Sequence, residues 1–278
     1  MIVMNDTYMF PEEDMHEQII AMDNTLAKKS TKFTVDEQRL FYIVLASIKP
    51  TQKNNEIEIS KKAIVDMLEL KSRDVYSRIR PMFKKLALNS WIEFGDDEIW
   101  EDGFLFPSIR TTKKNVYVEV AKKYIPLLIE LAPGFTRLLS DDAISFKSKF
   151  SMLIYQQLMR LNNKGHYGVG FTTKELKELF GMSKEDYMNN GNFDRYNFEK
   201  KTVNVAIQDI NEKSKCINNL RYEKRKKGNR IQGYVFFFDY CDPNNFREIY
   251  HTTIDDYIDN NQTEELDSLL SDLHEGKL

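Results

Sequence analysis

One order of structural elements occurs twice in this chain of 278 residues, and no other feature of the sequence constrains the fold as strongly. Apolar residues recur at helical spacing in six segments, which are 34–48, 61–70, 73–88, 145–162, 173–180 and 196–213. Strand-like patterns follow the third and the sixth of these segments, at 91–94, 104–109, 116–120, 216–223 and 231–238. Each half is therefore predicted to hold three helices followed by a β-hairpin, which indicates a duplication of whole domains.

Local signals place the ends of several of these helices. Thr34, Ser60 and Thr172 are each suited to cap the helix that follows, and Gly181 provides a natural stop. Pro81 lies inside the third helical pattern, so we expect a kink or a break there.

Three helices with an appended hairpin are the order of a winged-helix unit, a helix-turn-helix followed by a β-hairpin. We therefore predict an α+β fold with two tandem winged-helix domains related by a pseudo-two-fold duplication. The expected parts are an acidic N-terminal segment, a first and a second winged-helix domain, and an acidic C-terminal tail with a helical leucine pattern, at residues 1–30, 31–130, 131–240 and 241–278.

Charge is distributed unevenly over these parts. The net charge is only −3, but residues 31–240 carry +9, while the first 30 residues carry −4 and the last 38 carry −8. A basic body between two acidic ends suggests a polyanionic partner. The alternative is a surface that is basic without a ligand, and charge alone does not separate the two interpretations.

The densest positive charge lies in the sequence KRKKGNR at 224–230, between the last two predicted strands. Its adjacent cations repel one another, and a phosphate backbone would relieve that repulsion. We interpret this loop as the tip of the second wing, turned at Gly228, which binds nucleic acid; a solvated hairpin is the alternative. If the module neutralises about six phosphates, affinity should fall with salt at a log–log slope of roughly −5. The aromatic residues at 234–238 are interpreted as packing rather than base-stacking groups.

The helix before this wing combines a packing face with a polar row. The packing face consists of Val203, Ala206, Ile207 and Ile210. The polar row consists of Lys200, Asn204, Gln208 and Asn211. Asn and Gln can bind adenine through two hydrogen bonds, and Lys can bind guanine or phosphate. A plain amphipathic helix with a hydrated face is the alternative, but its position directly before a cationic wing favours a recognition helix.

Both units contribute candidate DNA-binding residues. In the second unit they are Lys200, Lys201, Asn204, Gln208, Asn211, Arg221, Lys224, Arg225, Lys226, Lys227, Asn229 and Arg230. In the first unit they are Lys71, Ser72, Arg73, Arg78, Lys84 and Lys85, which cluster on or before the third helix. The hairpin tip of the first unit, GDDEIWEDG at 95–103, is acidic, which argues against a matching DNA-binding wing and for a protein–protein surface.

No pattern of catalytic residues is present. The four histidines are isolated, so the sequence has neither HExxH nor a His-x-His pair, and it lacks the GxxxxGK[ST] loop of P-loop ATPases. The acidic pairs Asp96-Asp97 and Asp141-Asp142 are interpreted as caps or solvated groups rather than metal ligands. We therefore predict no catalytic residue, no metal site and no cofactor.

Cysteine usage and hydropathy indicate the compartment. Cys216 and Cys241 lack paired spacing and are expected to be free thiols in a reducing cytosol. No uncharged apolar run reaches about 18 residues, and the N-terminal residues do not resemble a signal peptide. A cytoplasmic location without membrane association is the prediction.

Five segments, in their order along the chain, resemble the Rep_3-type (RepB/RepE-like) family of plasmid replication initiators. They are IIAMDNTLAKKSTKFTVDEQRLFYIVLASI, GFTRLLSDDAISFKSKFSMLIYQQL, FTTKELKELFGM, YNFEKKTVNVAIQDIN and KRKKGNRIQGYVFFF, and the resemblance spans residues 19–240.

The resemblance implies a non-catalytic initiator that binds directly repeated double-stranded DNA sites (iterons) at a replication origin. Such an initiator distorts the duplex and recruits host replication proteins such as the helicase or its loader. The resemblance also implies a homodimer in equilibrium with the monomer, with the first winged helix at the dimer interface, and repression of the protein's own promoter.

Carried onto this chain, the resemblance implies that the helix at 200–211 reads bases and that 224–230 grips the backbone, while Lys71, Arg73 and Arg78 contact adjacent DNA. A two-domain winged-helix transcription regulator that binds an inverted repeat is the alternative. The histidine pattern argues against a nucleolytic rolling-circle initiator.

Overall fold

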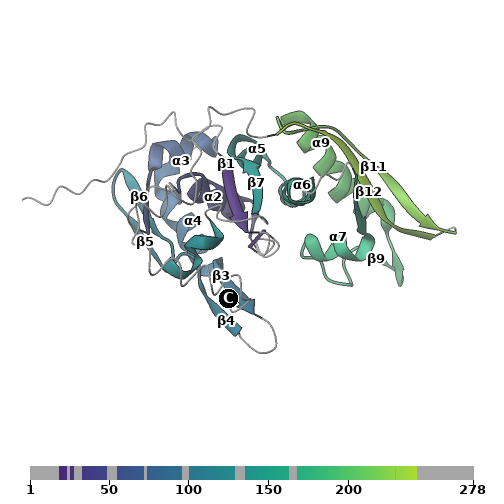
Figure 1. Ribbon diagram of the computed structural model, residues 1–278, viewed down its shortest axis with the longest axis horizontal. Coiled ribbons are helices and arrows are strands. Elements are labelled where there is room, and N and C mark those ends of the chain that lie inside the picture. The colour runs from purple at the N-terminus through teal and green to yellow at the C-terminus, as the bar shows by residue number, and fades with distance from the viewer. Residues whose placement is uncertain are drawn as a thin grey trace, which may run out of the picture.

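A computed structural model of the chain describes residues 19–23, 26–27, 33–48, 55–71, 74–95, 100–128, 135–162, 168–228 and 230–242. Figure 1 shows two groups of helices and strands with helix α6 (Lys149–Asn162) between them. Helices and small sheets are mixed in both groups, which confirms the predicted α+β class. Among the described residues, no helix has both the length and the apolar composition needed to cross a membrane.

The first group contains three helices and two small antiparallel sheets. The helices are α2 (Val35–Ala46), α3 (Lys61–Met67) and α4 (Val75–Asn89). One sheet has the order β2-β6-β5, with strands Glu56–Ser60, Asn115–Glu119 and Ser108–Thr111, and the other is the hairpin of β3 (Trp91–Gly95) and β4 (Trp100–Phe104). The predicted caps are confirmed, because Thr34 accepts a hydrogen bond from the N–H of Glu37 and Ser60 accepts one from the N–H of Ala63.

Two local features of this group differ in part from the predictions. Helix α4 continues through Pro81, so the break does not occur, while the kink that was the other expectation stays a prediction. Pro81 removes one backbone hydrogen bond, but Ile79 and Phe83 on either side of it are fully buried and hold the helix against the core. Strand β4 begins at Trp100, so the last part of the predicted turn at 95–103 is strand; residues 96–99 of that turn lie outside the described residues.

A strand pair and two helices lie between the two groups in the chain. β1 (Ile19–Asp23) pairs antiparallel with β7 (Phe135–Leu139), which follows the short 3-10 helix η3 (Lys122–Leu127). The helix predicted at 145–162 is present as α6, but it begins only at Lys149, because α5 (Ser140–Ser145) ends before it. The break occurs where Phe146 takes an extended backbone conformation and buries its ring completely.

The second group contains one three-stranded sheet, one short two-stranded hairpin and several helices. Its elements are β8 (Gly168–Thr172), α7 (Thr173–Leu179), β9 (Met188–Asn189), β10 (Asn192–Phe193), α8 (Arg195–Phe198), η4 (Glu199–Val203), α9 (Asn204–Lys213), β11 (Ile217–Lys227) and β12 (Arg230–Tyr240). The sheet has the order β11-β12-β8 and is antiparallel. Figure 1 shows β11 and β12 as a long ribbon that extends away from the helices.

One hydrophobic core runs through both groups. Residues 151–159 of α6 are all buried, and α6 packs against β7 on one side and α9 on the other. Tyr42 of α2 donates a buried hydrogen bond of 2.8 Å to Gln156 of α6. The domain boundaries predicted at residues 30, 130 and 240 stay predictions, and residues 1–18 and 243–278 lie outside the described residues.

Candidate nucleic-acid interface

The predicted recognition helix is one helical segment made of α8, η4 and α9. At its start, the carboxylate of Asp194 accepts a hydrogen bond of 3.1 Å from the backbone N–H of Asn197. Hydrogen bonds from the side chain and the backbone of Asn197 lower the pKa of Asp194, so this cap is charged at neutral pH, which suits a helix N-terminus. Val203, Ala206 and Ile210 are fully buried, which confirms the predicted packing face.

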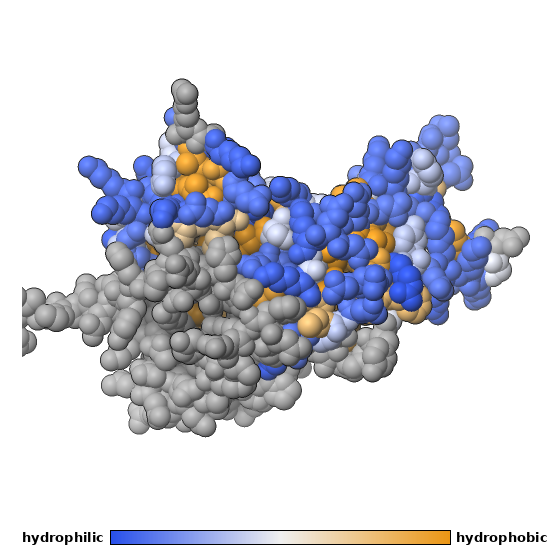
Figure 2. All heavy atoms as spheres, turned by 90° about the horizontal axis from the view of Figure 1, so that it is seen from above, coloured by the Kyte–Doolittle hydropathy of each residue, from blue (hydrophilic) through white to orange (hydrophobic). Residues whose placement is uncertain are grey.

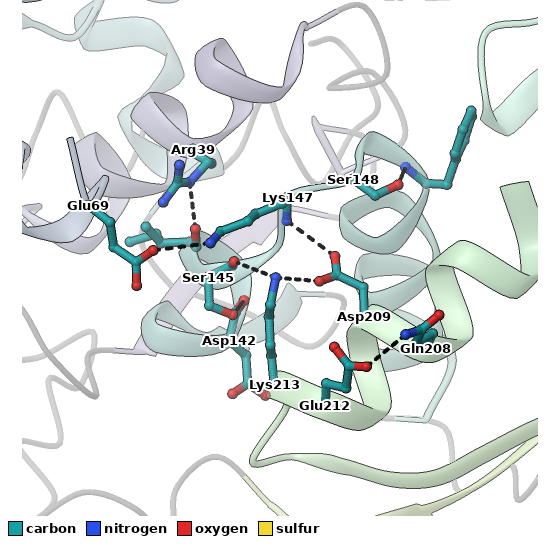
Figure 3. Close-up of polar contacts among 12 residues, drawn as sticks. Arg39, Glu69, Asp142, Ser145, Lys147, Ser148, Gln208, Asp209, Glu212 and Lys213 are labelled. Carbon is teal, nitrogen blue, oxygen red and sulfur yellow. Dashed lines mark hydrogen bonds and ion pairs between the residues drawn. The ribbon is translucent and has the colours of Figure 1, made fainter. Parts of the chain in front are cut away.

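All four residues of the predicted polar row are exposed. Its exposed members before Asn211 are Lys200, Asn204 and Gln208, and the adjacent Lys201 is also exposed. Gln208 Nε2 donates to Glu212 Oε1 at 2.9 Å, so an amide and a carboxylate lie side by side on the helix (Figure 3). Such a pair offers both donors and acceptors to a base edge.

Asn211 differs from the rest of the row, although it is exposed too. Its side-chain amide donates to the Leu220 carbonyl at 2.8 Å and its side-chain oxygen accepts from the Leu220 N–H at 2.7 Å. The side chain therefore holds β11 against the helix, next to Asn219 with its positive φ of 52°. A base-reading role for Asn211 stays a prediction.

The middle of the helix contains a π turn at Glu199–Val203. A π turn inserts an extra residue, so side chains before and after it do not keep the angular relation of a regular α-helix. Tyr196 lies before the turn and is 70% exposed, while Val205 lies after it and is 39% exposed. Tyr196, Val205 and the exposed Glu212 were not among the predicted site residues, although all three lie off the predicted apolar stripe.

The wing is longer and its turn is tighter than predicted. β11 reaches Lys227 and β12 begins at Arg230, so the prediction of a loop over 224–230 is wrong. Gly228 lies in the turn with a positive φ of 60°, and Asn229 lies outside the described residues. Lysine and arginine are weak strand formers, but backbone pairing along β12 keeps them in register apart from a shift between Arg225 and Lys226.

The cations of this ribbon fall into two classes. Lys224 Nζ lies 2.7 Å from Glu199 Oε2, in an ion pair with the recognition helix. Arg221 lies over the ring of Phe237, at 5.5 Å from the ring centroid. Arg225, Lys226, Lys227 and Arg230 have exposed side chains that make no hydrogen bond, ion pair or ring contact with any part of the chain that the structure describes. The end of the molecule that carries β11 and β12 is correspondingly covered mainly by hydrophilic residues (Figure 2).

The aromatic run that follows the wing packs inside the second group, as predicted. Tyr234 and Phe236 are fully buried and Phe238 is 8% exposed. Tyr222 of β11 packs against Tyr234 with a ring-centroid distance of 5.5 Å. These aromatic side chains therefore pack in the core at the base of the ribbon, and they are not available to stack on bases.

A buried carboxylate anchors the far end of the recognition helix. Asp142 of α5 is completely buried and accepts hydrogen bonds from Ser214 Oγ at 2.5 Å, Lys215 N at 2.8 Å and Cys216 N at 3.1 Å. The interpretation of Asp142 as a solvated or capping group is therefore wrong. No cluster of three or more His, Cys, Asp or Glu side chains suited to hold a metal ion occurs among the residues that the structure describes.

The candidate residues of the first group lie mainly on α4. Arg78, Lys84 and Lys85 are exposed there, and Lys71 is exposed just before it, while Ser72 and Arg73 lie outside the described residues. Arg80 is exposed on the same helix, and the sequence analysis missed it. A DNA contact by this group stays a prediction.

Both halves of the chain match models of protein families. Residues 19–159 match the family described as "Initiator Replication protein, WH1", and residues 172–238 match the family described as "Initiator Rep protein, WH2". These matches confirm the two predicted winged helices in their predicted order. A comparison with curated proteins finds no match.

Solved structures with a similar fold include the crystal structure of the Pi initiator protein in complex with iteron DNA. The identity is 17%, the TM-score is 0.68, and the match covers 81% of this chain and 98% of that one. Two crystal structures of domains 2 and 3 of RctB also match. Their TM-scores are 0.45 and 0.44 and their identities are 11% and 12%; they cover 74% and 75% of this chain and 82% and 83% of their own.

Proposed function

The chain belongs to the family of initiator replication proteins, and from this we propose that it starts replication of a plasmid or related replicon by binding directly repeated double-stranded DNA sites (iterons) at the origin. The bound protein then distorts the duplex and recruits host replication proteins, such as the helicase or its loader.

One observation carries this proposal: an exposed polar helix lies beside a ribbon whose outer cations have no partner among the described residues. The helix offers Asn204 and Gln208 to base edges in a major groove. The ribbon offers Arg225, Lys226, Lys227 and Arg230 to phosphates. If each of these four cations neutralises one phosphate, the ribbon alone contributes about −3.6 to the log–log slope of affinity against salt.

The first winged helix has two roles in this proposal. It forms the interface of a homodimer that represses the protein's own promoter, and it contacts DNA next to each repeat through α4 and the segment before it. The exposed Arg78, Lys84 and Lys85 support the second role. The proposal places the protein in the cytoplasm and gives it no catalytic activity.

Footprinting on the gene's own upstream region, across a salt titration, tests the proposal. The wild type is compared with the triple variant Arg225→Ala/Lys226→Ala/Lys227→Ala. The control variant, Lys113→Ala/Lys114→Ala/Lys122→Ala, removes the same charge from exposed positions of the first group. We expect evenly spaced protected repeats, a slope that is shallower by about 2.7 in the ribbon variant, and an unchanged slope in the control.

Two other outcomes of these experiments would indicate a different function. A single footprint over an inverted repeat, without opening of adjacent AT-rich DNA, would identify a transcription regulator. Nicking of supercoiled origin DNA in the presence of Mg²⁺ or Mn²⁺ would contradict the non-catalytic proposal.

A further inference from the structure

Four polar side chains connect the recognition helix to the base of the wing. Arg195 and Glu199 lie one turn apart on the helix, and Lys224 and Tyr234 are direct cross-strand partners in β11 and β12. Arg195 Nη1 donates to Tyr234 Oη at 3.0 Å. Tyr234 Oη in turn donates to Glu199 Oε1 at 3.0 Å, and Lys224 Nζ donates to Glu199 Oε2 at 2.7 Å. We call this chain of hydrogen bonds the helix–wing network.

The Lys224 side chain is 37% exposed, but burial of Glu199 makes the loss of its partner unfavourable. Glu199 is 8% exposed, and each of its oxygens accepts one of the bonds just described. Burial raises the pKa of Tyr234, so its hydroxyl keeps the proton that it donates. If Lys224 moved to a phosphate, Glu199 would remain as a buried charge with a neutral hydroxyl as its bonded partner, which is unfavourable.

The arginine of the network reaches a second point on the wing. Arg195 Nη2 donates to the carbonyl of Ile231 at 3.1 Å, and the guanidinium lies over the ring of Phe193 at 5.2 Å from the centroid. Since the guanidinium is planar and its donors have fixed directions, these bonds hold β12 at a defined angle to α8.

Lys224 differs in orientation from the cations that follow it. Successive side chains of a strand point to opposite faces, so Lys224 shares the face of Tyr222, whose ring packs toward Tyr234. Arg225 points to the opposite face. The adjacent lysine and arginine are therefore not equivalent, although the sequence presents them as one basic run.

We infer that Lys224 is a positioning residue, which together with Glu199, Tyr234 and Arg195 fixes the angle between the recognition helix and the wing. The phosphate contacts of the ribbon are made by the cations beyond it, Arg225, Lys226, Lys227 and Arg230. The inference rests on the proposed function, because a protein that reads bases and backbone at once needs this angle fixed.

The test compares two lysines of one strand. Lys224→Met and Lys226→Met each remove one charge, and affinity is measured against salt for duplexes with and without the origin repeat. Lys226→Met should make the slope shallower by about 0.9 on both duplexes. Lys224→Met should leave the slope unchanged and lower the preference for the repeat by about tenfold, comparable to one lost base contact. Glu199→Gln should lower it in the same way, and Lys224→Arg, which retains the ion pair, should restore most of it.

Two results would overturn the inference. One is a slope that becomes shallower by about 0.9 in Lys224→Met as well, since Lys224 would then be a phosphate contact. The other comes from thermal unfolding of the free protein with Lys224→Met, Glu199→Gln and the double variant. Additive effects there would show that the two side chains are not coupled. The unfolding measurement needs no DNA, so it tests the coupling of Lys224 and Glu199 independently of DNA binding. A wild type without preference for the repeat would contradict the proposed function and not the network.

Discussion

Replacement of Asp142 by Ala should destabilise the whole chain, because this carboxylate joins α5 to the turn between α9 and β11. It accepts one hydroxyl and two backbone hydrogen bonds, from Ser214, Lys215 and Cys216, and no part of it is exposed. Hydrogen bonds to a charged acceptor contribute about 1.5–3 kcal/mol each, but such terms are not additive. Asp142→Ala leaves these three donors without their acceptor, at about 1–3 kcal/mol for each buried group before non-additivity, so we expect a loss of about 4 kcal/mol.

Asp142→Asn removes the charge but retains the size and shape of the side chain, so it separates the two contributions to stability. The amide retains one accepting oxygen and places an NH₂ group either opposite the N–H of Lys215 or opposite Ser214 Oγ and the N–H of Cys216. We expect about half the loss of the Ala variant, about 2 kcal/mol.

Asp141→Ala is the matched control for both Asp142 variants. Asp141 is the neighbouring acid and forms a partly exposed ion pair of 3.0 Å with Lys215. The control should lose less than about 1 kcal/mol.

Thermal unfolding followed by circular dichroism measures these differences. For a domain of this size, about 4 kcal/mol corresponds to a fall in Tm of roughly 12 °C. Equal losses in Asp141→Ala and Asp142→Ala would refute the reasoning, because a buried acid and a partly exposed acid would then contribute alike.

Three further predictions concern other parts of the second group. Gly233→Ala should cost about 3 kcal/mol in unfolding free energy, because a Cβ at this position would lie 2.2 Å from the carbonyl oxygen of Phe171 across the β8–β12 pair; unchanged urea unfolding would contradict this. Hydrogen bonds from Asn197 lower the pKa of Asp194, so wild-type stability should fall relative to Asp194→Asn as the pH drops below about 4, and parallel pH profiles would contradict this. Burial raises the pKa of the Cys216 thiol, so iodoacetamide should label Cys241 alone in the native protein and both cysteines in urea, as mass spectrometry can show.

The order of elements was predictable because it depends on local patterns. The apolar periodicity of 34–48 and 173–180 and the caps at Thr34 and Thr172 act within a few residues, and the structure retains them as α2 and α7. The cationic run at 224–230 was equally visible as a concentration of charge.

The missed features depend on parts of the chain that are distant in sequence. β1 is a strand because β7 offers it a partner, which no window around residues 19–23 reveals. Lys224 looks like its neighbours in the sequence, and Glu199, 25 residues earlier, makes it different. Asp142 resembled a surface acid because its three donors lie more than 70 residues away.

The bonds that hold the recognition helix lie at its start, its middle and its end. At the start, Arg195 binds β12; in the middle, Asp209 accepts from the N–H of Lys147 at 3.2 Å and pairs with Lys213 (Figure 3). At the end, the turn after α9 is bound to Asp142. Lys147 also pairs with Glu69 of the first group at 3.3 Å, but both side chains are about two-thirds exposed and such pairs contribute about 0–1 kcal/mol.

The position of the recognition helix relative to the first group therefore depends mainly on the buried α6, which packs on both β7 and α9. The side chains that anchor the recognition helix thus differ from the side chains that it offers to DNA bases. Lys201 and Asn204 make no side-chain hydrogen bond or ion pair within the described ranges, and they lie between the anchored ends. A surface of this kind can change its base preference by substitution at these positions without loss of the anchors, because neither side chain supplies a hydrogen bond or ion pair to them.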